Sequence, residues 1–249
     1  MLLAVDIGNT TITFGVFKQK RLLRRFSLQT CRRGSAALQK KLRALALDAV
    51  IVSSVVPGAT AALKKDLKKI FPGLAPLVLG RNIKAPIKNL YRDPAQVGQD
   101  RLANAYAAFS RYARAAVVVD FGTAVTFDVI SPKGAYLGGM ILPGLGICLD
   151  ALAVRTALLP KVALSLPAEF IGRDTRNSML SGVVHGFAAL TDELAKRIKK
   201  KIGPRAKVIG TGGNIGLIAR YCRAFDLIDP DLTLKGLNLI YNKVKQNKP

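Results

Sequence analysis

The sequence predicts an α/β protein with two similar lobes, each built from a mixed β-sheet with flanking helices. Three observations lead to this fold class. Segment 2–17 recurs as 115–130, and each copy reads as an apolar strand, a glycine-containing turn and a second strand. Strand patterns and helical periodicities then follow both copies. Half of the 249 residues are apolar, so a chain of this length needs no disulfide or metal for stability.

The elements are expected in a similar order in both halves. After the first hairpin we expect a strand at 21–30, a helix at 35–47, a strand at 49–56, a helix at 59–71, a strand at 75–79 and a helix at 100–112. After the second we expect a strand at 135–142, a helix at 177–201, a strand at 207–209 and a helix at 215–220. The hinge is expected near Ala113 and Arg114, which gives lobes of 1–113 and 114–249 with a cleft between them.

The two hairpin turns share their polar residues. The corresponding pairs are Asp6 and Asp120, Gly8 and Gly122, Thr10 and Thr123, and Thr13 and Thr126. Glycine lets the backbone approach a ligand, Asn and Thr donate hydrogen bonds, and Asp holds a cation or its waters. One such turn is also ordinary hairpin chemistry, but two at matching places favour a phosphate site divided between the lobes.

Composition excludes several classes of protein. Lys and Arg number 39 against 15 Asp and Glu, a net charge of +24, yet the basic residues are spread along the chain like solvated helix faces. There is no Trp, and aromatic residues do not alternate with the basic clusters, so nucleic acid is not an expected partner. The longest uncharged stretch, 134–149, is interrupted by Pro143, so no membrane association is expected.

Few residue types are available for catalysis. Cys31, Cys148 and Cys222 are widely spaced and odd in number, which indicates reduced thiols in a cytoplasmic protein. His185 is the single histidine and excludes a multi-histidine zinc site. Chemistry is therefore expected to rest on carboxylates, hydroxyls, basic residues, backbone amides and bound ions.

Six short segments resemble a known enzyme family in their order. They are DIGNT (6–10), GQDR (98–101), DFGTA (120–124), GGMILPG (138–144), IGRDT (171–175) and TGG (211–213). This order is similar to that of type III pantothenate kinases in the sugar kinase/actin superfamily. The resemblance implies an actin/hexokinase-like, ribonuclease H-like fold with an ATP cleft between the lobes. It also implies a cytoplasmic homodimer that phosphorylates pantothenate with ATP, the first step of coenzyme A biosynthesis, and that needs Mg²⁺ and K⁺ or NH₄⁺.

The resemblance also implies roles for particular residues. ATP is expected to contact Asp6, Ile7, Gly8, Asn9, Thr10, Thr11, Ile12, Thr13, Thr123, Gly212 and Gly213. Within that set, Asp6 is implied to lie near Mg²⁺, directly or through water. Asp120 is implied to bind the monovalent cation.

The acceptor site follows from the same resemblance. Pantothenate is expected to contact Tyr91, Gly98, Gln99, Asp100, Arg101 and Thr175. Asp100 is implied to be the catalytic base, Arg101 to bind the substrate carboxylate, and Thr175 to reach it from the partner subunit. An ionised Asp beside Arg and a helix N-terminus is expected to be a weak base, which would make orientation its larger contribution.

Plainer interpretations remain open at the sequence level. Asp100 would equally cap the helix that follows, with Arg101 on the surface, and Thr175 would cap the helix before Asn177. Gly212 and Gly213 are equally suited to a tight turn. The alternative functions are a kinase for another small hydroxyl substrate and a non-catalytic relative with a regulatory or polyanion-binding role.

Overall fold

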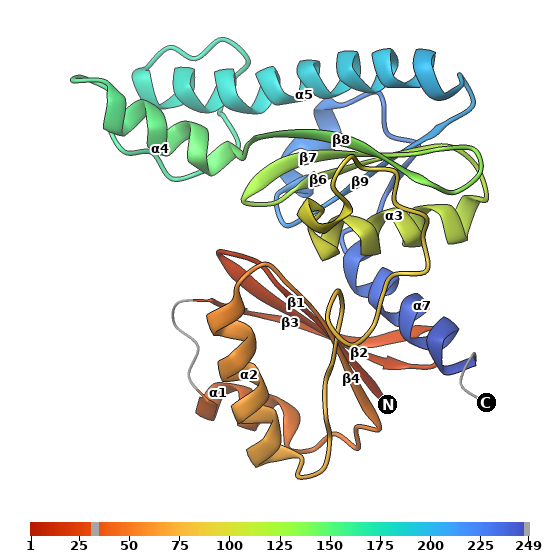
Figure 1. Cartoon of the computed structure of the whole chain (residues 1–249). Helices are drawn as coiled ribbons and strands as arrows, with labels where there is room; N and C mark the ends of the chain where they lie inside the picture. The colour runs from red at the N-terminus through yellow and green to blue at the C-terminus, as the bar shows by residue number, and fades with distance from the viewer. Residues whose placement is uncertain (31–34, 247–249) are drawn as a thin grey trace. The chain divides into compact units, whose positions relative to one another are not determined.

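The computed structural model describes residues 1–30 and 35–246, and all side chains in these ranges except those of 35–37. The chain forms two compact units. The first takes Met1–Lys88, Arg92–Ala107 and Leu232–Pro249, and the second takes Asn89–Tyr91 and Ala108–Asp231. Each unit contains one five-stranded mixed sheet with helices packed against it (Figure 1). The predicted α/β class with two similar sheets is confirmed.

The first sheet has β1 at its centre, antiparallel to β2 and parallel to β4. The strand order is β3-β2-β1-β4-β5, with bounds β1 (Leu2–Ile7), β2 (Thr11–Lys18), β3 (Arg21–Gln29), β4 (Ala49–Ser54) and β5 (Leu77–Val78). Leu3, Val5 and Ile7 pack against α1 (Ser35–Leu42) and α2 (Pro57–Ile70). Leu2 and Ala4 point to the other face and pack against α7 (Leu232–Gln246).

The second sheet repeats this topology. Its order is β10-β9-β6-β7-β8, with bounds β6 (Ala116–Phe121), β7 (Ala124–Ile130), β8 (Tyr136–Pro143), β9 (Lys207–Thr211) and β10 (Leu227–Ile228). The central strand β6 is antiparallel to β7 and parallel to β9, as β1 is to β2 and β4. Its core is shared with α4 (Leu145–Arg155), α5 (Thr175–Ile202), α6 (Ile215–Ile218) and the 3₁₀ turn η2 (Ala219–Tyr221). The internal repeat inferred from the sequence is therefore a repeat of sheet topology.

Helix α3 (Gln99–Tyr112) follows the 3₁₀ turn η1 (Pro94–Gln96), and its first half packs on α7. A Cβ at Gly236 of α7 would collide with the carbonyl group of Ala103, so the two helices touch through their backbones. Thr233 Oγ1 donates a hydrogen bond of 2.8 Å to Asn104 Oδ1 beside this contact. The contact with α7 therefore directly follows the first turn of α3, which carries Asp100 and Arg101.

The C-terminal helix departs from the predicted division into 1–113 and 114–249. Leu234, Leu237 and Ile240 of α7 pack with Leu2 and Ala4 of β1, which places the end of the chain in the first unit. Helices α7 and α4 and strand β10 are not among the elements expected from the sequence. The first unit is therefore built from both ends of the chain.

The described cysteines are free thiols. Cys148 and Cys222 form no disulfide, and Cys31 lies outside the described residues. Burial raises the pKa of Cys148. Burial, with a smaller contribution from the charge of Asp192, raises the pKa of Cys222 to about 12. Both thiols are therefore protonated near neutral pH.

Among residues 1–30 and 35–246, no helix has the length and the apolar composition that a membrane span requires.

Candidate active site

The Asp6 turn joins β1 to β2 and leaves several polar groups at the surface. The Gly8 amide donates to Thr11 O at 3.0 Å, and Thr30 Oγ1 donates to Gly8 O at 2.8 Å. Asn9, Thr10 and Thr11 are exposed, whereas Asp6 is partly buried. The backbone of the turn is thus held in place while its donors face solvent, as binding of phosphate oxygens requires.

The Asp120 turn has the equivalent position between β6 and β7. The Gly122 amide donates to Ala124 O at 3.1 Å. The Asn214 amide donates to Phe121 O at 3.0 Å and ties the end of β6 to the turn that follows β9. The duplicated turns therefore share their strand positions and their internal hydrogen bonding.

Gly212 leaves room for the Asp120 carboxylate. Its φ angle is 96°, a region that favours glycine. A Cβ at this position would collide with Asp120 Oδ1 and with the backbone of Phe121. Gly212 thus serves the turn and also makes room for the carboxylate predicted to bind a cation, while Gly213 has open space around its Cα.

Asp100 and Arg101 lie in the first turn of α3, which begins at Gln99. Asp100 Oδ1 accepts a hydrogen bond of 2.9 Å from the Arg101 amide, so the carboxylate does serve the helix start. It is not the N-cap, because it lies inside the helix. The Arg101 side chain is only 9% exposed, which rules out a surface arginine. A carboxylate and a guanidinium therefore occupy adjacent positions at a partly enclosed helix start.

Burial raises the pKa of the Asp100 carboxyl group above its usual value. The amide and charge of Arg101 and the amide of Asp100 itself lower it, but by less than burial raises it. The expectation of a weak base was therefore wrong in direction. A raised pKa gives Asp100 a higher proton affinity than an exposed aspartate, which suits a general base.

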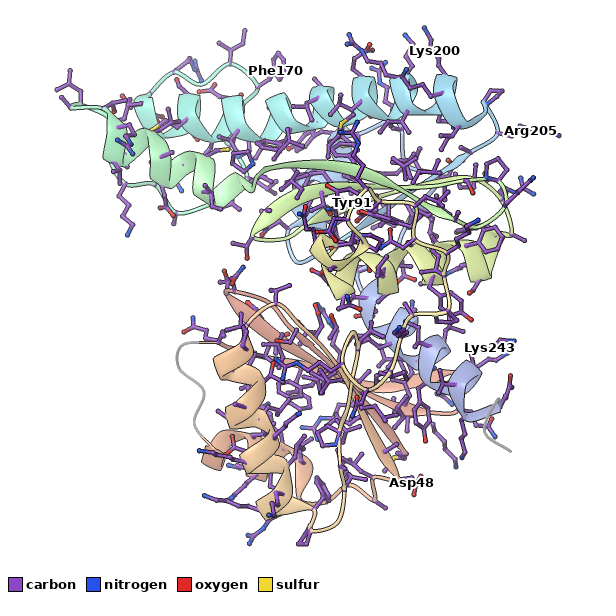
Figure 2. All side chains as sticks on the ribbon, viewed as in Figure 1. Asp48, Tyr91, Phe170, Lys200, Arg205 and Lys243 are labelled. Carbon is purple, nitrogen blue, oxygen red and sulfur yellow. The ribbon has the colours of Figure 1, made fainter. Side chains whose placement is uncertain are left out.

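Tyr91 lies in the second unit (Figure 2), where its ring lies next to Gly138 of β8. Its amide donates to Asn89 Oδ1 at 3.0 Å, and its ring is 6.4 Å from that of Tyr136. The Tyr136 hydroxyl donates to the buried Asp128 Oδ1 at 2.9 Å. This surrounding of Tyr91 is not predictable from the sequence, because no sequence pattern indicates that Asp128 and Tyr136 pair.

Thr175 is the first residue of α5. The N-cap is Asp174, whose Oδ1 accepts a hydrogen bond of 2.8 Å from the Asn177 amide. Thr175 itself is exposed. The interpretation of Thr175 as the helix cap was therefore wrong, and the residue that performs this role directly precedes it in the sequence.

The donor set at both aspartates consists of oxygen atoms. Asp6 is the register partner of Thr13, and Asp120 is the register partner of Thr126. In the part of the chain that the structure describes, no three His, Cys, Asp or Glu residues come together as a metal site. Mg²⁺ commonly takes one or two carboxylates and completes its shell with phosphate oxygens and water. The residues around Asp6 therefore fit a nucleotide-bound Mg²⁺.

Comparison with known proteins shows which family the chain resembles. Residues 2–197 match the model of the type III pantothenate kinase family. A type III pantothenate kinase of Dehalococcoides mccartyi is 41% identical over 250 residues, which cover 96% of both chains. A solved structure from Campylobacter jejuni, described as a Baf family transcriptional activator, has a TM-score of 0.61 at 23% identity and covers 98% of this chain and 99% of its own.

A second solved structure supports the fold class. A Listeria monocytogenes protein assigned as an N-acetylmannosamine kinase has a TM-score of 0.56 at 15% identity, with 98% of this chain and 99% of its own covered. Identities this low support the fold alone, whereas the sequence match extends over almost the whole chain. The chain therefore belongs to the type III pantothenate kinase family.

Proposed function

We propose that this protein transfers the γ-phosphoryl group of ATP to the hydroxyl group of pantothenate in the cytoplasm. The product is 4′-phosphopantothenate, and the reaction is the first step of coenzyme A biosynthesis. The observation that carries this proposal is the Asp100–Arg101 pair at the start of α3, where a carboxylate of raised pKa adjoins a buried guanidinium. Together they match the two polar ends of an acceptor that has a hydroxyl and a carboxylate.

The acceptor is oriented by charge and deprotonated by the neighbouring carboxylate. Arg101 binds the pantothenate carboxylate through paired N–H donors, a geometry that suits guanidinium groups. Asp100 accepts the hydroxyl proton as the oxygen attacks the γ-phosphorus. Tyr91, Gly98 and Gln99 complete the contacts with pantothenate.

The nucleotide is held mainly by backbone and hydroxyl donors. Residues 6–13 bind the ATP phosphates through the exposed donors of the turn. Asp6 holds Mg²⁺ directly or through water, and the ion, when bound, neutralises charge on the phosphates. In the second unit, Asp120 binds K⁺ or NH₄⁺, and Thr123, Gly212 and Gly213 contact ATP.

We propose that the active form is a homodimer. Apolar side chains are exposed on β8, on α4 and in the segment before α5, namely Ile141, Ile147, Val154, Leu158, Phe170 and Ile171. Phe170 projects away from the ribbon near α5 (Figure 2). Exposed apolar groups of this kind mark protein interfaces, and a second copy would cover them. Thr175 follows this segment directly, which is consistent with a contact to pantothenate in the partner's site.

The dimer is tested by the double substitution Leu158→Glu and Phe170→Ser. Leu158 is 92% exposed and Phe170 is 71% exposed, so both changes leave the core of the unit intact. We expect sedimentation velocity to detect a monomer, with a pantothenate KM raised at least about tenfold because the partner's Thr175 is lost. Leu23→Glu, at an exposed position on β3, is the control and should remain dimeric. An active monomeric wild type at micromolar concentration would contradict the dimer.

The acceptor is tested by offering alternative hydroxyl substrates under the same conditions. Pantothenate should be phosphorylated at least about a hundredfold faster than pantothenyl alcohol, because only pantothenate presents a carboxylate to Arg101. Mass spectrometry of the product identifies the phosphorylated species. Transfer to N-acetylmannosamine in preference to pantothenate would instead support the kinase for another small hydroxyl substrate.

A further inference from the structure

Each turn aspartate has a hydroxyl residue beside it on the parallel neighbouring strand. Asp6 of β1 is in register with Ser53 of β4, and Asp120 of β6 is in register with Thr211 of β9. Residues directly opposite one another in a sheet point to the same face. Ser53 therefore lies on the Asp6 side of its sheet, and Thr211 lies on the Asp120 side of the other.

Both hydroxyl groups are buried without a hydrogen-bond partner. Ser53 is 0% exposed and Thr211 is 1% exposed. Among the described residues, neither Ser53 Oγ nor Thr211 Oγ1 forms a hydrogen bond. Buried polar groups are almost always satisfied in native proteins, because desolvation without a partner is unfavourable. The recurrence of this feature at equivalent strand positions indicates a shared role.

Other hydroxyl groups in the protein have hydrogen-bond partners. Ser54 Oγ accepts from the Val56 amide at 3.0 Å and from Thr60 Oγ1 at 2.6 Å. Buried Thr191 donates to Phe187 O at 2.7 Å, within its own helix. These hydroxyls have structural partners, so the lack of one at Ser53 and Thr211 is particular to the positions beside the aspartates.

We propose that Ser53 and Thr211 are a duplicated pair of positioning residues. When nucleotide and ions are bound, each hydroxyl forms a hydrogen bond with the adjacent aspartate carboxylate or with a water molecule that this carboxylate holds. Ser53 thereby orients the Asp6 end of the Mg²⁺–nucleotide site, and Thr211 orients the monovalent-cation site at Asp120. The inference rests on the proposed function only for the binding of nucleotide and cations, not for the acceptor.

The test at Ser53 compares Ser53→Ala with Ser54→Ala. Removal of an unsatisfied hydroxyl should leave the Tm of the ligand-free protein unchanged or raised, while Ser54→Ala should lower it. In the presence of Mg²⁺, Ser53→Ala should weaken binding of a non-hydrolysable ATP analogue about tenfold or more, and Ser54→Ala should not. Calorimetric titration of the analogue with and without Mg²⁺ measures this difference.

The test at Thr211 uses one variant without the hydroxyl and one that keeps it. The wild-type protein should bind the ATP analogue more tightly in K⁺ than in Na⁺. Thr211→Val should reduce this ratio of affinities about tenfold, and Thr211→Ser should restore it. Thr191→Val, which loses a satisfied hydroxyl, is the control: it should lower the Tm without changing the response to K⁺.

Opposite results would overturn the inference. If Ser53→Ala and Thr211→Val lower the Tm of the free protein and leave the cation dependence of analogue binding unchanged, both hydroxyls are structural. Wild-type protein that binds the analogue with no dependence on either cation also overturns it. Cation-dependent binding without transfer to pantothenate would refute the proposed function but leave the assignment of Ser53 and Thr211 intact.

Discussion

Asp100→Asn is expected to lower kcat about 10²–10⁴-fold, the range that a positioned general base contributes. Asparagine keeps the size of the side chain and its acceptor for the Arg101 amide, but it cannot take the hydroxyl proton. The folded protein is expected to tolerate the change. Because burial raises the pKa of Asp100, its ionised form is less favourable in the folded chain than in the unfolded one.

The direction of this pKa shift determines how the stability of the protein depends on pH. The contribution of Asp100 to the free energy of unfolding is fully present below its pKa in the unfolded chain, near 3.8. It is lost as pH rises through the raised pKa in the folded chain. At neutral pH, Asp100→Asn should therefore unfold at the same temperature as wild type or at a higher one. The difference should disappear below the unfolded pKa, as thermal unfolding across this pH range will measure.

The pH dependence of activity provides the complementary readout. Wild-type kcat/KM should fall on acidification through a pKa above the usual aspartate value, and this limb should be absent in Asp100→Asn. Asp93→Asn changes an exposed aspartate nearby and should keep both activity and pH profile. Near-native turnover by Asp100→Asn would disprove the assignment of the base.

Gly212→Ala is expected to lower the free energy of unfolding by about 2–4 kcal/mol, because a positive φ and a backbone collision act together. The φ angle is 96°, and the new methyl group would collide with Asp120 Oδ1 and Phe121. Displacement of the Asp120 carboxylate should also weaken activation by K⁺.

Gly213→Ala is the matched control for this loop. A Cβ at Gly213 meets nothing within 4 Å, and its φ is not in the left-handed region. Its free energy of unfolding should change by less than about 0.5 kcal/mol. Urea unfolding of both variants measures the difference, and equal stabilities would refute the support of Asp120 by Gly212.

Local patterns predicted much of the fold. The duplicated turns at Asp6 and Asp120 identified the two sheets, because alternation and turn chemistry are encoded in consecutive residues. Helix α7 was missed although Leu234, Leu237 and Ile240 have helical spacing. Its return to β1 depends on contacts between the two ends of the chain, which no local pattern contains.

The residues of the candidate site could be predicted from the sequence, but their burial and their neighbours in the fold could not. The resemblance supplied Asp100 and Arg101, while the direction of the Asp100 pKa depends on burial, which a local sequence pattern does not contain. Ser53 and Thr211 carry no signal in isolation, since only strand register places them beside the aspartates. The capping role of Asp174, in contrast, was readable from an Asp three residues before Asn177.

The most direct test of the proposed reaction measures ADP release from ATP and Mg²⁺, with and without pantothenate, in K⁺ buffer and in Na⁺ buffer. We expect turnover that requires pantothenate and is much faster in K⁺ than in Na⁺. A folded protein whose ADP release does not depend on pantothenate would contradict the proposed reaction and point to another acceptor or to a non-catalytic role.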